Sequence, residues 1–190
     1  MEETTRATVY FPRPGKENTG RVLELARARA AELGVRGIVV PTTSGATAVE
    51  AVRALEGLDV IIVTHSTGFR EPGGQELTEE HRLELERLEA KVLTTTHAFG
   101  GVGRAVRRRL NTFQVDEIIA HTLRIMGEGT KVACEVTLMA ADAGLVNMSG
   151  DVIALGGTGS GLDTALVLKP AHAQDFFSLR VREIICKPRM

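Results

Sequence analysis

The chain has 190 residues, of which 43% are hydrophobic and 25% charged, with a formal net charge of −1. These values are typical of one soluble globular domain over residues 1–190, and the charge favours neither nucleic acid nor an acidic membrane as a partner. The sequence has no apolar run of about 18 residues for a membrane span, and its acidic start lacks the core of a signal peptide. We therefore expect a cytoplasmic protein with no membrane partner, whose cysteines, Cys134 and Cys186, are free thiols.

Apolar runs alternate with helical patterns along the first half of the chain. Strands are expected at 8–11, 38–40, 59–65 and 91–96, and helices at 19–33, 48–55, from 78 and at 102–110. The unbroken apolar centre of the third strand, 60–63, is typical of a strand buried on both faces of a parallel sheet. Three βα units in a row predict a parallel, right-handed, layered α/β domain.

The second half changes character. Helices are expected at 115–126 and 131–143, although 131–136 also suits the beginning of a strand. Short strands are expected at 152–155, 165–169 and 182–186. The connection between the first two is too short for a helical crossover, so this pair is predicted to be an antiparallel hairpin at the edge of the sheet.

The turn between the second strand and its helix is the first candidate site. The first backbone N–H groups of a helix lack an intrahelical partner and carry the positive end of the helix dipole, which suits an anion. Ser44 and Thr47 can add side-chain donors, and Gly45 allows an oxygen to approach the backbone. In the alternative interpretation Ser44 only caps the helix. The residues expected to hold a phosphate are Thr42, Thr43, Ser44, Gly45, Ala46 and Thr47.

A second glycine-rich stretch covers residues 156–161. It does not match a Walker loop, because Leu162 stands where a lysine is needed, and it does not match a dinucleotide fingerprint, because a strand follows it. Its amides can form an anion nest, and the polar side chains after it can bind a polyol. The alternative is a long hairpin loop that needs positive φ angles. The residues expected to contact a ligand are Gly156, Gly157, Thr158, Gly159, Asp163 and Thr164.

Three histidines, His65, His97 and His172, follow predicted strands. Ligands of open α/β sheets bind beyond the carboxyl ends of the strands, so His65 and His97 are expected in the crevice and are the first candidates for a general acid or base. Their spacing, without a local carboxylate, does not suit a metal site. The loops around these two histidines are expected to add Thr67, Gly68, Phe69, Phe99 and Gly100 to the crevice, or to be plain loops.

Charged residues on two predicted helices have simpler interpretations. Glu135 and Asp142 share a helical face but lie too far apart to share a proton, so we expect a solvated face or salt bridges. The cluster of Arg104 with 107–109 has no interleaved aromatic residues, and it is expected to be a solvated face that balances the acidic segment 79–89.

Taken together, several stretches carry a family resemblance: 9–11, 14–19, 39–48, 63–69, 135–144, 156–157, 163–165, 170–172 and 182–189. Through them, essentially the whole chain resembles the stand-alone microbial relatives of the C-terminal α/β domain of pyruvate kinase. The resemblance implies a three-layer α/β sandwich with a mixed, mostly parallel sheet. In pyruvate kinase this domain holds an allosteric sugar phosphate through a turn that is similar to residues 43–48. The stand-alone relatives are associated with bound FMN, with no assigned reaction, and kinase activity is not implied because nothing here resembles the catalytic barrel.

We therefore expect an FMN-binding protein, with the phosphate at 42–47 and the ring extending towards the strand-end loops and residues 156–161. A homo-oligomer is left open, and no catalytic residue is identified. The alternative is a non-catalytic sensor or binding module for a sugar phosphate or another nucleotide. A phosphatase or hydrolase lacks an obvious nucleophile or metal set in this sequence.

Overall fold

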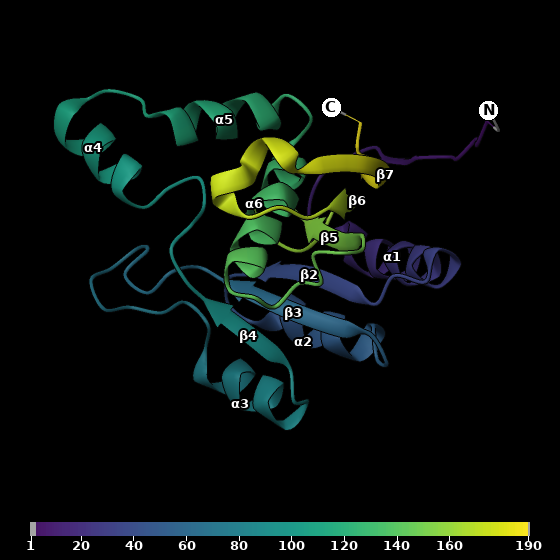
Figure 1. Cartoon of the computed structure of the whole chain (residues 1–190). Coiled ribbons are helices and arrows are strands. Elements are labelled where there is room, and N and C mark those ends of the chain that lie inside the picture. Colours follow the sequence, from purple (N-terminus) through teal and green to yellow (C-terminus); the bar gives the residue numbers. More distant parts are fainter. Residues whose placement is uncertain (1–2, 190) are drawn as a thin grey trace.

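A seven-stranded sheet divides two layers of helices in the computed structural model, which describes residues 3–189 (Figure 1). The strand order is β1-β7-β6-β5-β2-β3-β4. All strands run parallel except β6, which is antiparallel to both of its neighbours. The strands are β1 (Val9–Phe11), β2 (Gly37–Thr42), β3 (Asp59–Thr64), β4 (Lys91–Thr94), β5 (Val152–Gly156), β6 (Thr164–Lys169) and β7 (Arg180–Pro188).

Helices cover both faces of this sheet. One layer contains α1 (Thr19–Leu33), α2 (Ala46–Ala54) and α3 (Glu79–Arg87), and the other is dominated by the almost fully buried α6 (Glu128–Asp142). The helix α5 (Val115–Arg124) packs beside α6. The helix α4 (Val102–Leu110) contacts α5 and lies farther from the sheet (Figure 1). Two short 3-10 helices, Lys16–Asn18 and Ala173–Ser178, were not expected.

The alternation of side chains along β2 explains the three layers. Ile38 and Val40 point into the core under α1 and α2, whereas Val39 points into the core under α6. All three side chains are fully buried, because β2 lies in the middle of the sheet. The predicted three-layer α/β sandwich with a mixed, mostly parallel sheet is therefore confirmed.

One expectation about the second half is corrected, and one open alternative is excluded. β5 and β6 do pair antiparallel, but they lie inside the sheet, and the edges are β1 and β4. All five residues of β5 are buried, and its other side pairs in parallel with β2, which an edge hairpin could not do. The helix expected at 131–143 is present as α6, so the alternative that 131–136 begins a strand is excluded.

The carboxyl ends of the parallel strands bring four loops together. The register pairs Thr42 with Thr64 and Thr64 with Thr94, so the chain leaves β2, β3 and β4 at the same level. Its neighbour β5 ends on the other side of β2, which adds the glycine loop 157–161. Among residues 3–189, no helix combines the length and the apolar character needed to cross a lipid bilayer.

Candidate functional site

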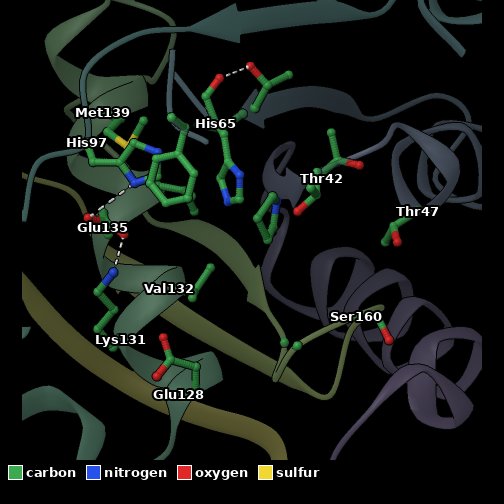
Figure 2. A pocket seen from close by; sticks show the side chains of 18 of the residues that line it. Thr42, Thr47, His65, His97, Glu128, Lys131, Val132, Glu135, Met139 and Ser160 are labelled. Atoms are coloured by element: carbon green, nitrogen blue, oxygen red, sulfur yellow. Dashed lines mark hydrogen bonds and ion pairs between the residues drawn. The ribbon is translucent and has the colours of Figure 1, made fainter. Parts of the chain in front are cut away.

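A cavity of about 360 Å³ lies at this carboxyl edge, between the loops and α6 (Figure 2). It collects residues from every segment that ends there and from the last turn of α5. Its lining consists of Pro41, Thr42, Thr43, Ser44, Thr47, Val63, Thr64, His65, Phe69, Arg70, His97, Arg104, Arg124, Glu128, Lys131, Val132, Glu135, Val136, Met139, Gly157, Gly159, Ser160 and Gly161.

The turn before α2 presents hydroxyl groups to this cavity. Gly45 is the N-cap of α2 at a φ of 105°, and no side chain caps the helix, so Ser44 does not have the capping role of the alternative interpretation. The Thr42 hydroxyl accepts a hydrogen bond from the Gly45 N–H at 3.1 Å and keeps its own proton available for donation. The start of α2 thus combines amides without a side-chain cap and a group of neighbouring hydroxyls.

Gly45 and Ala46 do not line the cavity. A Cβ on Gly45 would lie 2.3 Å from the Cβ of His81 and 2.6 Å from Cδ1 of Leu77, so this glycine permits close packing against the beginning of α3. The Ser44 carbonyl accepts a hydrogen bond from the Thr78 N–H at 3.1 Å in the same contact. In the structure Gly45 therefore fixes the shape of the turn.

The glycine loop forms the opposite rim, where Gly157, Gly159, Ser160 and Gly161 line the cavity. Asp163, which is fully buried, holds this loop from behind. Its Oδ2 accepts hydrogen bonds from the N–H groups of Gly15 at 3.2 Å and Thr158 at 3.0 Å. Its Oδ1 accepts one from the Thr164 hydroxyl at 2.8 Å. Four residues expected to contact the ligand therefore lie outside the lining: Gly156, Thr158, Asp163 and Thr164.

Three rings form a cluster on the third side of the cavity. The Phe69 ring lies 4.2 Å from that of His65 and 4.8 Å from that of His97, and the planes of Phe69 and His97 are only 15° apart. The guanidinium of Arg104 covers the Phe69 ring at 4.6 Å, a distance typical of a cation–π contact. This cluster brings together the two histidines that the sequence placed at the strand ends.

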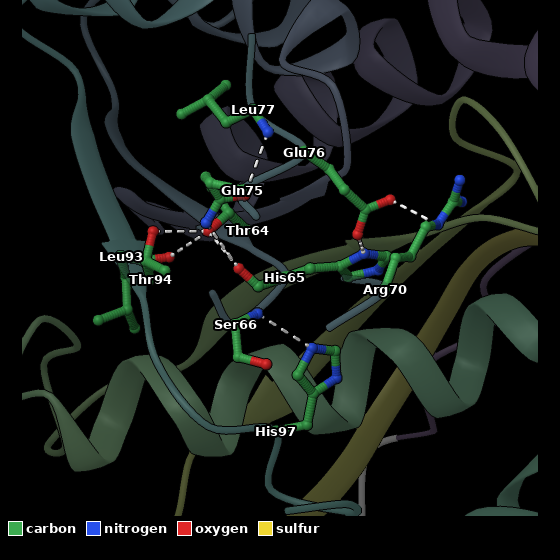
Figure 3. A network of polar contacts seen from close by, with 10 residues as sticks. All are labelled: Thr64, His65, Ser66, Arg70, Gln75, Glu76, Leu77, Leu93, Thr94 and His97. Carbon is green, nitrogen blue, oxygen red and sulfur yellow. Dashed lines mark hydrogen bonds and ion pairs between the residues drawn. The ribbon is translucent and has the colours of Figure 1, made fainter. Parts of the chain in front are cut away.

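Polar contacts fix the orientation of the two histidines (Figure 3). His65 Nδ1 donates to the carboxylate of Glu76 at 2.6 Å, which fixes the plane of the ring. His97 Nε2 accepts from the Ser66 N–H at 3.5 Å. The other expected loop residues, Thr67, Gly68, Phe99 and Gly100, lie outside this cavity.

The remaining wall is one face of α6, which the sequence interpretation missed. Its residues recur every three or four positions: Glu128, Lys131, Val132, Glu135, Val136 and Met139. The expected salt bridge of Glu135 is confirmed, but its solvated alternative is wrong, because this carboxylate is buried. The signal in the sequence was a polar stripe on a helix whose other faces are apolar.

Lys131 and Glu135 form a buried ion pair on this face (Figure 2). Only 9% and 5% of their side chains are exposed. The Glu135 Oε1 atom also accepts from the Phe99 N–H at 3.0 Å and lies 3.8 Å from His97 Nδ1. Burial alone would raise the pKa of Glu135, but His97 and Lys131 outweigh it and lower the pKa to about 2. Glu135 is therefore a fixed negative charge and not a proton donor.

The other charged groups also find partners that the sequence did not indicate. Asp142 accepts from the Ala173 N–H at 3.0 Å and lies 3.3 Å from His172. Arg107 pairs with Glu117 of α5, and Arg104 reaches the cavity, so this cluster is not a face that balances the acidic α3. Within residues 3–189, no group of three or more His, Cys, Asp or Glu is placed to hold a metal ion.

Comparison with known proteins identifies the family. Residues 20–168, from α1 to β6, match the family model described as pyruvate kinase, alpha/beta domain. The chain belongs to this family. The pyruvate kinase alpha/beta domain accounts for the resemblance found in the sequence and for the observed layers.

A solved structure gives a weaker likeness. It is an NH3-dependent NAD synthetase from Campylobacter jejuni in complex with the nitrate ion, at 14% identity and a TM-score of 0.42. The match covers 75% of this chain and 56% of the synthetase chain. A likeness at this level carries no argument about function.

Proposed function

We propose that the cavity binds FMN, with the phosphate held by the hydroxyls and amides before α2. The observation that carries the proposal is that one cavity joins this turn to a ring cluster and to a glycine loop. The proposal includes a cytoplasmic location. Cys134 and Cys186 are free and buried, which suits a reducing compartment.

The residues present fit the phosphate end of FMN. Thr42, Thr43, Ser44 and Thr47 line the cavity, and residues 41–47 include no carboxylate that would repel an anion. The uncapped start of α2 adds amide donors and the positive end of a helix dipole.

The part of the cavity beyond the turn suits the flat ring of FMN. The whole cavity, about 360 Å³, falls within the range of roughly 300–1,000 Å³ that small-molecule sites occupy. His65 and Phe69 of the ring cluster line the cavity, and Val132 and Met139 of α6 offer apolar contact. A bound flavin would supply electron transfer, while the chain binds the phosphate, orients the ring and limits its contact with water.

Removing single hydroxyls from the turn tests the phosphate site. We expect Ser44→Ala and Thr47→Val each to weaken FMN binding by about tenfold, because a hydrogen bond to a charged group contributes roughly 1.5–3 kcal/mol. Quenching of FMN fluorescence on titration measures the Kd. Thr67→Ala is the matched control, since Thr67 is exposed and lies outside the cavity. Equal FMN affinity in all three variants and the wild type would show that the phosphate does not bind at this turn.

A second candidate is a non-catalytic sensor for a sugar phosphate. It is favoured by Arg104, which lines the cavity away from the turn and, among the described residues, pairs with no carboxylate, as suits a second phosphate group. A thermal-shift comparison separates the two candidates, because a ligand raises the melting temperature only if it binds the folded state. Stabilisation by FMN and not by fructose bisphosphate supports the flavin, and the reverse result supports the sensor.

A further inference from the structure

A smaller hollow of about 190 Å³ lies next to the main cavity, between the loops after β3 and β4 and the first turns of α4. The two cavities share Phe69, His97 and Arg104, which form a common wall. The residues that line the hollow are Ser66, Gly68, Phe69, Thr96, His97, Gly101, Arg104, Ala105 and Arg108.

The lining of this hollow is basic. It includes two arginines and a histidine but no carboxylate. Arg104 and Arg108 are one turn apart on α4, so their side chains emerge on the same face of the helix. Among the residues that the structure describes, neither guanidinium pairs with a carboxylate, whereas Arg107 on the same helix pairs with Glu117.

The neighbouring residues restrict and complement this charge. Arg104 is held over the Phe69 ring at 4.6 Å, and Phe69 is stacked on His97. Ser66 and Thr96, which follow β3 and β4, add hydroxyl groups to the lining of the hollow. Guanidinium forks bind carboxylate and phosphate oxygens through paired hydrogen bonds, and hydroxyls can complete such a site.

We propose that this hollow is a second binding site, which takes the oxyanion group of a small molecule beside the ligand of the main cavity. Two positive side chains without a counter-charge create a local potential that attracts an anion. The hollow has about half the volume of the main cavity, which suits a carboxylate or phosphate group with a short carbon chain. Because the two sites share one wall, the anion lies next to whatever the main cavity holds.

NMR titration of the 15N-labelled chain tests this site with acetate, succinate and inorganic phosphate as probes, at constant ionic strength set by sodium chloride. We expect saturable shifts at the amides of Gly101 and Ala105. Arg104→Gln and Arg108→Gln should each weaken binding at least tenfold, as judged on spectra that also show the variants to be folded. Arg109→Gln is the matched control, because Arg109 lies on the same helix but lines neither cavity.

Each outcome of the titration is informative. Saturation by acetate or succinate assigns the site to carboxylates, and saturation by phosphate alone assigns it to phosphates. Shifts that do not saturate, or an equal loss in Arg109→Gln, overturn the proposal. Phosphate bound before α2 would instead move the Thr47 amide, and FMN binding is measured separately on the same samples, so failure of the flavin proposal leaves this result interpretable.

Discussion

Replacing Lys131 by methionine is expected to lower the free energy of unfolding by about 3–5 kcal/mol, because it leaves a buried carboxylate without its cation. Glu135 is only 4% exposed and cannot turn to solvent. The double variant Lys131→Met/Glu135→Leu should recover most of this loss, since apolar side chains of similar volume often replace a buried ion pair at little cost. Urea unfolding of the single and double variants measures both values.

A matched pair on the same wall provides the control. Arg124 and Glu128 are also four residues apart, but their side chains are 35% and 33% exposed, so Arg124→Met should cost less than about 1 kcal/mol. An equal loss of unfolding free energy in Lys131→Met and Arg124→Met would contradict a buried Glu135 carboxylate that depends on Lys131.

The pH dependence gives a second readout of the same pair. Folding lowers the pKa of Glu135 from 4.5 to about 2, so its contribution to stability is present above pH 4.5 and lost as the pH falls towards 2. The stability difference between the wild type and Glu135→Gln should therefore shrink over this range. A difference that stays constant from pH 6 to pH 2 would mean that the carboxylate is not held as an anion.

Gly156→Ala is expected to destabilise the chain by about 3 kcal/mol, because it overpacks a backbone contact. A Cβ at this position would lie 2.0 Å from the carbonyl oxygen of Gly129 near the start of α6. To relieve the contact, α6 must move away from β5, which also shifts the wall that carries Lys131. Denaturant unfolding and FMN titration of the variant should show both effects.

Gly20→Ala is the corresponding control. Gly20 lies in α1 with nothing within 4 Å of the added Cβ, so the variant should keep or gain stability, by up to about 1 kcal/mol. A Gly156→Ala variant as stable as Gly20→Ala would show that α6 is not packed against β5 as closely as described.

Local patterns were enough to predict the elements but not their order in the sheet. The apolar runs and helix signals placed every strand and every α-helix within a few residues, because periodicity and caps act over short distances. The position of β5 depends on its pairing with β2, more than a hundred residues earlier in the chain, which no local signal specifies. The unbroken apolar run 152–155 was the available hint, since an edge strand seldom needs two apolar faces.

The parts of the candidate site that lie in loops after strands could be predicted from the sequence. The turn at 42–47 and the histidines after β3 and β4 were visible as sequence patterns, and the topology brings them to one edge of the sheet. Lys131 and Arg104 were missed as site residues because charged residues on a helix usually face solvent. Lys131 is buried where α6 packs against the sheet, and Arg104 of α4 reaches the cavity over the Phe69 ring. Asp163 was taken for a ligand contact because a buried carboxylate that supports a loop looks the same in sequence.

The proposal that the cavity holds FMN is tested most directly by purifying the chain without added flavin, denaturing it and analysing what is released. We expect a yellow protein that releases about one equivalent of a fluorescent compound with the mass and retention time of FMN, and that takes up FMN again after refolding. A colourless protein that also fails to bind added FMN would contradict the proposal.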